Sequence, residues 1–424
     1  MAEARTSSSA GVMEGIRWDE LRAIVGEPYI RPAARDNAVL GVLPQMLVEP
    51  GNESELAAAL KWADQNGLAV IPRGGGTKMD WGNPPARADL VLSTGRLNHV
   101  LEHAWADLTV SVESGVTVEQ LQNTLAAHGQ RLAIDPLFPE RATIGGILST
   151  NDSGTLRLRF GALRDLIIGV TIALPDGTIA SSGGKVVKNV AGYDLPKLIT
   201  GAFGTLGVIT RAVFRLHPLP RVRRSLTFRC ENFQKGNELL LAIQASKLAH
   251  TALQLRGSRE GNCELDVRFA GTDAGLDAQS TIVRSLAASA HEMDTSLAVW
   301  NSLQQLWADA ENCLIAKFSV LPTDIGATCE QFRQIAGKLN WRAVIQGTGL
   351  GWIRMDASDA AVLRSAASKL RSPIQTFVVL HRPATLAGLD VWGVPGDPFP
   401  VMLAVKRQFD PNGTLNPGRF VGGI

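Results

Sequence analysis

Three glycine-rich segments restrict the fold of this chain more than any other feature of its sequence. They are "RGGGTK" at 73–78, "TIGGILSTNDSG" at 143–154 and "GAFGTLGVIT" at 201–210. Glycine makes up 42 of the 424 residues, above the usual share, and the excess gathers in and around these segments. Such clustering indicates backbone that packs close to a ligand, because glycine has no side chain to keep the ligand away.

The segment 73–78 follows a short apolar run and predicts an anion-binding loop. Consecutive glycines can adopt positive φ angles and turn successive N–H groups toward one point, and Arg73, Thr77 and Lys78 can add donors. The order Thr77-Lys78 does not fit the Walker pattern, and Met79 stands where the dinucleotide pattern needs its last glycine. The alternative is a tight turn after a strand.

The other two segments have plain alternatives as well. In 143–154 the small side chains let a flat ring approach the backbone, and the hydroxyl and amide groups can hydrogen-bond the edge of that ring; a simple turn is equally compatible. In 201–210 closely spaced glycines precede a β-branched strand, and their alternative role is to let a helix pack on a strand.

Hydrophobic periodicity predicts the elements around these segments. Residues 50–76 predict a helix and then a strand that leads into the glycine loop. Residues 108–115 predict a strand with Leu108, Val110 and Val112 on one face. The stretch 143–216 is predicted to be rich in strands.

Beyond a predicted linker at 217–224 the pattern changes. Short strands and amphipathic helices follow one another as β-α-β-β-α up to about residue 288. After a short helical segment they recur as β-α-β-β-α-β. Two such passes predict a duplicated split βαβ unit, an antiparallel sheet covered by helices.

Taken together with "RFGALRDLIIGV", "PDG" and "SGGKVVKNVAGYDLPKLITGAFGTLGVIT", the three segments resemble the FAD-binding domain of the vanillyl-alcohol-oxidase and p-cresol-methylhydroxylase superfamily. The resemblance covers roughly residues 41–220 and the C-terminal "LNPGRF". Within the superfamily it is greatest to the second FAD-binding subunit of bacterial glycolate oxidase. It implies an α+β fold, with a two-part FAD-binding domain of the p-cresol-methylhydroxylase type and an α+β cap that has an antiparallel sheet.

The resemblance also implies a division of the chain. We expect an N-terminal tail and lead-in helix at 1–40, the FAD-binding domain at 41–220, a cap or substrate domain at 221–393, and a C-terminal return to the FAD domain at 394–424.

Site residues can be carried over from the same resemblance. The 73–78 loop would hold the FAD pyrophosphate, 143–154 would line the ribityl chain and the isoalloxazine ring, and 207–210 would lie against the adenine half. The implied FAD-binding residues are Arg73, Gly74, Gly75, Gly76, Thr77, Lys78, Thr143, Ile144, Gly145, Gly146, Thr150, Asn151, Ser153, Gly154, Gly207, Val208 and Ile209. Relatives with covalently bound flavin commonly carry a histidine just beyond the glycine loop, and no histidine occurs here before His99, so FAD is expected to bind noncovalently.

No catalytic residue and no metal ligand can be assigned. The catalytic relatives carry a His-x-Gly-Asp-type segment linked to metal and 2-hydroxy-acid binding, and this sequence lacks it. A 2-hydroxy acid needs a cationic clamp on its carboxylate, for which Lys188, Tyr193 and Arg164 are candidates. The pair His381-Arg382 is better explained by a loop or core role.

The resemblance implies an FAD-binding subunit of a glycolate oxidase complex, which oxidises glycolate to glyoxylate and passes electrons to a partner. The expected partners are a second flavoprotein subunit and an iron–sulfur subunit. Two alternatives stay open: a stand-alone FAD-dependent oxidase or dehydrogenase of another alcohol or hydroxy acid, and an assembly subunit that holds FAD only for structure.

Composition narrows the remaining classes of function. The net charge of +2 argues against a nucleic-acid-binding surface. Four cysteines without a Cys-x-x-Cys pair indicate free buried thiols in a reducing compartment. The N-terminus shows no signal-peptide pattern and the longest apolar stretch, at 166–174, is too short to span a bilayer. We therefore expect a protein that is cytoplasmic or peripheral to the inner face of the membrane.

Overall fold

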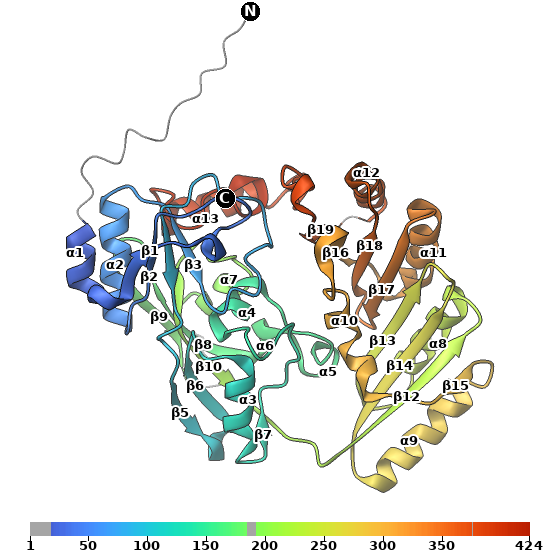
Figure 1. Ribbon diagram of the computed structural model, residues 1–424. Helices are drawn as coiled ribbons and strands as arrows, with labels where there is room; N and C mark the ends of the chain where they lie inside the picture. Colours follow the sequence, from blue (N-terminus) through green and yellow to red (C-terminus); the bar gives the residue numbers. More distant parts are fainter. Residues whose placement is uncertain (1–17, 185–191, 375) are drawn as a thin grey trace, which may run out of the picture.

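Two main sheets and a two-stranded one lie in the first half of the chain, and one larger sheet forms most of the second half (Figure 1). The computed structural model describes residues 18–184, 192–374 and 376–424. We call the part built from residues 18–218 and 399–424 the first lobe, and the part built on residues 222–381 the cap. The mixture of helices and antiparallel sheets confirms the predicted α+β class.

The first sheet delivers the glycine loop. Its strands run in the order β1-β2-β4-β3, with β2, β4 and β3 parallel. Helix α2 covers it and begins where the side chain of Asn52 accepts a hydrogen bond from the N–H of Glu55 at 2.9 Å. Leu56 and Leu60 of α2 are fully buried against this sheet. The elements are α1 (Trp18–Val25), β1 (Ile30–Pro32), β2 (Met46–Val48), α2 (Glu53–Gln65), β3 (Val70–Arg73) and β4 (Leu90–Ser93).

The second sheet is antiparallel, in the order β5-β6-β10-β8-β9. Val110 and Val112 are buried on its inner face, as predicted, but Leu108 is not: it is exposed and has φ of 53° just before β6. The strands are β5 (Val100–Ala104), β6 (Thr109–Glu113), β8 (Ile167–Ala173), β9 (Ile179–Gly183) and β10 (Val208–Arg215). Helix α3 (Val118–Ala126) and the short strands β7 (Gln130–Arg131) and β11 (His217–Pro218) complete this part.

The stretch 143–216 is less strand-rich than its sequence predicts. Outside residues 185–191, which the structure does not describe, it holds four short helices besides β8, β9 and β10, namely α4 (Ile144–Thr150), α5 (Arg157–Phe160), α6 (Leu163–Leu166) and α7 (Leu195–Ile199). The predicted linker at 217–224 is also shorter in the structure, because β11 pairs with β7 and β12 already begins at Val222.

The cap is one eight-stranded antiparallel sheet, in the order β15-β12-β14-β13-β17-β18-β16-β19. Each half is a split βαβ unit, and the two units join edge to edge through β13 and β17. This duplication agrees with the predicted one, although β15, the three-residue fourth strand of the first unit, was not expected. The strands are β12 (Val222–Cys230), β13 (His250–Ser258), β14 (Cys263–Gly271), β15 (His291–Met293), β16 (Cys313–Ser319), β17 (Asn340–Gln346), β18 (Leu350–Asp356) and β19 (Thr376–His381).

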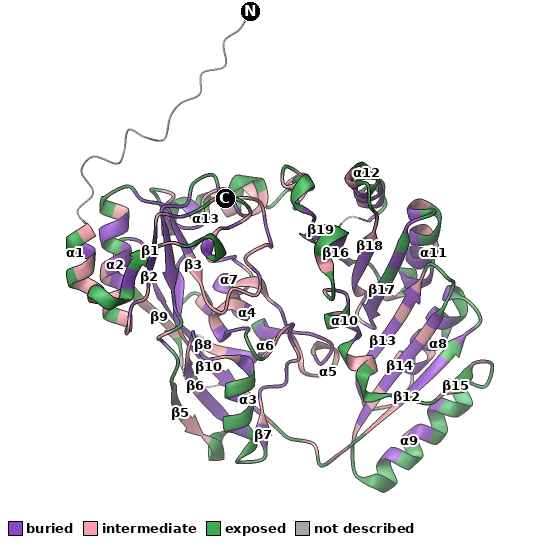
Figure 2. Cartoon of the chain, viewed as in Figure 1, coloured by how far each residue is buried: buried purple, intermediate pink, exposed green. Residues whose placement is uncertain are grey.

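One face of the cap sheet is covered by helices and forms the cap core. Figure 2 shows the sheet strands largely buried and the outer surfaces of the helices exposed. Phe228, Phe269, Phe318 and Phe332 are nearly or completely buried there, and the four cysteines are buried free thiols, as predicted. The helices are α8 (Phe233–Ala245), α9 (Asp273–Leu286), α11 (Ile325–Ala336) and α12 (Ala360–Arg371).

The other face of the cap sheet meets the first lobe through a set of apolar side chains that we call the boundary cluster. Helix α10 (Ser302–Gln305) lies on this side, between the sheet and the first lobe (Figure 1). The buried members of the boundary cluster come from both lobes and are Trp81, Leu137, Phe203, Leu306, Val344, Trp352 and Leu380.

The chain returns to the first lobe after the cap. Helix α13 (Phe399–Phe409) precedes a segment in which Leu415 forms a parallel bridge with Val70 of β3. The N–H of Asn416 donates to the carbonyl of Val70 at 3.0 Å. The C-terminal segment thus lies beside the strand that leads into the glycine loop. Among the residues that the structure describes, no helix combines the length and the apolar character that crossing a bilayer requires.

Candidate FAD site

The glycine loop begins at the end of β3 and passes very close to the segment before α4. A Cβ atom on Gly75 would lie 1.8 Å from the carbonyl oxygen of Arg141, and one on Gly74 would lie 2.0 Å from Oγ1 of Thr143. Of the three glycines only Gly76 has a positive φ, of 74°. Glycine is therefore needed at 74 and 75 for close approach and at 76 for backbone conformation.

Backbone donors of this loop have no partner among the residues that the structure describes. In the described part of the chain, no backbone or side-chain acceptor takes a hydrogen bond from the N–H groups of residues 74–78. Five consecutive N–H groups next to a cleft are an arrangement that suits an anion such as a phosphate.

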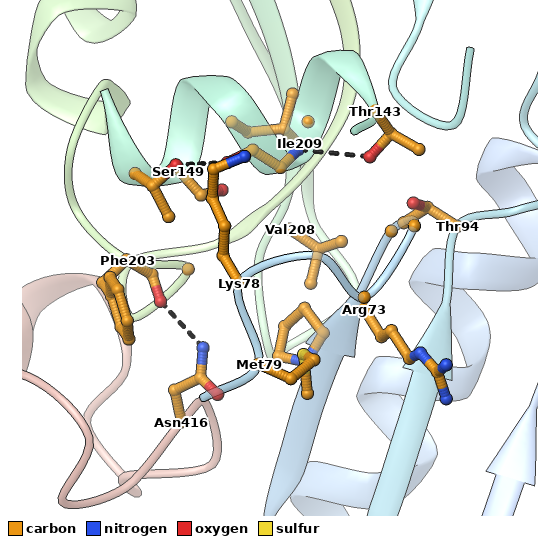
Figure 3. Close-up of a pocket in the computed structure, with 18 of the residues that line it drawn as sticks. Arg73, Lys78, Met79, Thr94, Thr143, Ser149, Phe203, Val208, Ile209 and Asn416 are labelled. Atoms are coloured by element: carbon orange, nitrogen blue, oxygen red, sulfur yellow. Dashed lines mark hydrogen bonds between the residues drawn. The ribbon is translucent and has the colours of Figure 1, made fainter. Parts of the chain in front are cut away.

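A cleft runs from this loop toward α4 and the start of β10 (Figure 3). The space between its walls is about 690 Å³, including the part open to solvent. Thirteen of the seventeen residues expected from the sequence line it. They are Arg73, Gly74, Gly75, Gly76, Thr77, Lys78, Thr143, Gly145, Gly146, Thr150, Gly207, Val208 and Ile209.

Four expected residues do not line the cleft. Ile144 is fully buried in the core under α4. Asn151, Ser153 and Gly154 follow α4, and a Cβ atom on Gly154 would lie 1.9 Å from the carbonyl oxygen of Asp135. Gly154 therefore serves close packing inside the lobe, whereas Oδ1 of Asn151 and Oγ of Ser153 are buried without a partner.

Helix α4 contributes surface to the cleft rather than free donors. The side chain of Thr143 accepts a hydrogen bond from the N–H of Gly146 at 3.4 Å. The N–H groups of Ile144 and Gly145 donate to the carbonyls of Val116 and Ser114. Because these donors are occupied, the two glycines of α4 do not contribute free N–H groups to the cleft. Their contribution is that they have no side chains, which leaves room for a flat group against the helix.

Lys78 is less available for a phosphate than its sequence position suggests. Its ammonium is paired with Asp152 at 3.1 Å, and both side chains are almost completely buried. It also lies 5.6 Å from the centroid of the Trp81 ring. The positive charge of Lys78 is therefore already balanced, and the anion-binding capacity of the loop rests mainly on its N–H groups.

The C-terminal segment supplies a wall of the cleft that residue spacing alone did not predict. Asn416 donates through Nδ2 to the carbonyl of Phe203 at 2.8 Å (Figure 3), and its Oδ1 is buried without a partner. Arg419 donates to the carbonyls of Met79 and Trp81 at 2.8 and 2.7 Å. Burial lowers the pKa of Arg419 to about 10, against the opposing effect of Asp80. The only sequence signal for this wall is the "LNPGRF" that belongs to the family resemblance.

The candidates for a carboxylate clamp do not gather at the cleft. Tyr193 is 96% exposed, and Arg164 is also exposed. Neither lines the cleft, and Lys188 lies outside the described residues. His381 and Arg382 instead hold the two lobes together, through Asp80 at 3.0 Å and the carbonyl of Gly82 at 3.2 Å.

The chemistry of the cleft fits FAD. Free N–H groups on one loop suit its pyrophosphate, glycines on α4 leave room for its flat ring, and unpartnered polar atoms such as Oδ1 of Asn416 and Nε of Arg419 suit its polar edges.

Comparison with known proteins agrees with this chemistry. Residues 44–183 match the family model described as FAD binding domain. The solved structure of p-cresol methylhydroxylase with substrate bound superposes with a TM-score of 0.74 at 15% identity, covering 95% of this chain and 95% of that one. The chain therefore contains an FAD-binding domain, and its fold is of the p-cresol-methylhydroxylase type, as predicted.

Curated relatives are similar over part of their length. The glycolate oxidase subunit GlcD of Bacillus subtilis is 32% identical over 212 residues, which are 50% of this chain and 45% of that protein. A D-lactate dehydrogenase of Archaeoglobus fulgidus is 32% identical over 291 residues, 65% of this chain and 62% of that protein. In both cases the match covers less than two thirds of the relative's length.

Proposed function

We propose that the chain is an FAD-dependent oxidoreductase of a 2-hydroxy acid such as glycolate, and that it works as one subunit of a complex. The observation that carries the proposal is the cleft beside five N–H groups that have no partner among the described residues, in a chain with an FAD-binding domain. The names of its relatives support the substrate class, because glycolate and D-lactate are both 2-hydroxy acids.

The described residues would hold the cofactor and shield the reaction. When bound, FAD supplies an acceptor for the hydride that leaves the hydroxyl-bearing carbon. The N–H groups of residues 74–78 would bind its pyrophosphate, and Gly145 and Gly146 would lie against its flat ring. The boundary cluster would exclude water from the region between the cleft and the cap.

The proposal includes partners. Electrons would leave through a second flavoprotein subunit and an iron–sulfur subunit. One relative is by name a subunit, of glycolate oxidase, which supports work in a complex. We propose that the chain works in the cytoplasm or at the inner face of the membrane.

The purified chain is expected to be yellow and to lose its colour on acid precipitation. The described lining of the cleft includes no histidine, cysteine or tyrosine, the nucleophilic side chains that commonly form covalent links to a flavin. The measurement is FAD absorbance in the supernatant and in the washed pellet. Colour that stays with the pellet would show a covalent bond.

Without partners, the chain is expected to bind FAD but to be reduced by glycolate slowly or not at all. The experiment is anaerobic mixing of the FAD-loaded chain with glycolate while the flavin absorbance is followed, with and without the partner subunits. Rapid and complete bleaching of the isolated chain would favour a stand-alone oxidase. No reduction even with partners would favour a subunit that holds FAD only for structure.

A further inference from the structure

One lysine of the cap stands on the sheet face that meets the first lobe. Lys317 of β16 lies directly opposite Trp352 of β18 and Val378 of β19, and cross-strand partners share a face of the sheet. Its neighbours in sequence, Ala316 and Phe318, belong to the cap core on the other face. The side chain of Lys317 therefore points toward the first lobe, among members of the boundary cluster.

Three donor groups in this region have no acceptor in the described part of the chain. The indole Nε1 atoms of Trp81 and Trp352 are buried and have no hydrogen-bond partner. The ammonium of Lys317 lies 5.6 Å from the centroid of the Trp352 ring, and within the described residues it makes no ion pair or hydrogen bond. Lysine and tryptophan side chains can donate hydrogen bonds but not accept them. Since buried indole N–H groups usually have a partner, the missing group is an acceptor.

The charges of the region leave an excess of positive charge. Asp152, on the first-lobe side, is paired with Lys78 at 3.1 Å. Burial lowers the pKa of Lys317, Asp152 opposes this effect and Arg157 adds to it. Two ammonium groups and the guanidinium of Arg157 thus face a single carboxylate, and the acceptor that completes the region is an anion.

We propose that Lys317, together with the indole N–H groups of Trp352 and Trp81, binds the carboxylate of the substrate at the boundary between the cap and the first lobe. This inference rests on the proposed function, which supplies a 2-hydroxy acid. It adds where the carboxylate of that acid is held. The surrounding Leu137, Val378 and Leu380 suit a small apolar remainder of the substrate.

The test is binding of oxamate to the FAD-loaded full chain by titration calorimetry. Oxamate is a monocarboxylate with no hydrogen on the carbon next to the carboxylate, so it binds without being oxidised. Lys317→Met keeps the length of the side chain and removes its charge. Because a hydrogen bond to a charged group is among the strong ones, we expect about tenfold or greater loss of oxamate affinity in this variant.

Two further variants separate binding from folding. Trp352→Phe keeps an aromatic ring and removes the N–H, and we expect an affinity loss of about threefold or more, typical of one buried hydrogen bond. Lys338→Met changes an exposed cap lysine and should bind oxamate like the unchanged protein. All three should keep their FAD, which flavin absorbance checks.

The outcomes separate this inference from the proposed function. Oxamate affinity that is equal in Lys317→Met and Lys338→Met, or no saturable binding by the unchanged protein, would overturn the carboxylate site even if the chain oxidises a hydroxy acid. Binding that depends on Lys317 in a chain that oxidises no hydroxy acid would leave the site standing and overturn the function. A change of the flavin spectrum in Trp352→Phe with unchanged oxamate affinity would assign this N–H to the flavin instead.

Discussion

Gly75→Ala is expected to lose most of its FAD. The added methyl group would lie 1.8 Å from the carbonyl oxygen of Arg141, which is backbone and cannot rotate away as a side chain could. The N–H of Arg141 is held by the carbonyl of Phe138 at 3.0 Å. The loop must therefore move, and its N–H groups move with it. Overpacking of this kind costs about 1–3 kcal/mol, so we expect FAD affinity to fall by about tenfold or more.

A matched substitution isolates the effect of the contact. Gly271→Ala also replaces a glycine with an ordinary φ, but its methyl group would meet nothing within 4 Å. FAD content after gel filtration should be low for Gly75→Ala and normal for Gly271→Ala. Equal FAD content in the two variants would mean that the loop is only a turn between β3 and the rest of the lobe.

Asp410→Asn is expected to destabilise the first lobe more than any surface change. Asp410 is buried, and its carboxylate accepts hydrogen bonds from Lys406 Nζ at 2.5 Å and from the N–H groups of Leu415 and Thr414 at 2.8 and 2.9 Å. Burial lowers the pKa of Lys406, and Asp410 opposes this. Removing the carboxylate leaves a buried ammonium without its counter-charge, which typically costs about 3–5 kcal/mol.

The measurement for Asp410→Asn is urea unfolding together with FAD affinity. FAD affinity should fall as well, because Asn416 of the same segment lines the cleft. Asp397→Asn, in an exposed position, is the control. Adding Lys406→Met to Asp410→Asn should recover part of the lost stability, since no charge then remains buried. A free energy of unfolding for Asp410→Asn within error of the Asp397→Asn value would contradict the role of the pair.

Local sequence signals predicted the parts of the cleft that one segment builds alone. The glycine loop could be predicted because three glycines in a row after an apolar strand have few structural uses. Helix α4 was missed because Gly145-Gly146 is typical of a turn. In the structure two features stabilise the helix: the N-cap formed by Thr143, and the burial of Ile144, Ile147 and Leu148 on one face. Together they exceed the unfavourable helix propensity of the two glycines.

Features that depend on pairing between distant segments could not be predicted. The duplicated pattern of the cap was visible in the alternation of its elements, but β15 has only three residues and exists because Thr227 to Arg229 of β12 pair with it. The position of Lys317 opposite Trp352 requires the register of β16 and β18. No spacing within one segment contains that information.

Because the chain returns to the first lobe after the cap, the first lobe can complete its folding only at the end of synthesis. Arg419 donates a hydrogen bond to the carbonyl of Met79, a residue 340 positions earlier in the chain, and Leu415 lies beside β3. As the polypeptide emerges from the ribosome, β3 and its loop appear early, while the segment that covers them comes only after the whole cap. One edge of β3 therefore stays unpaired until the C-terminal segment has been synthesised. The cap can fold in that interval, before the cleft closes around a flavin.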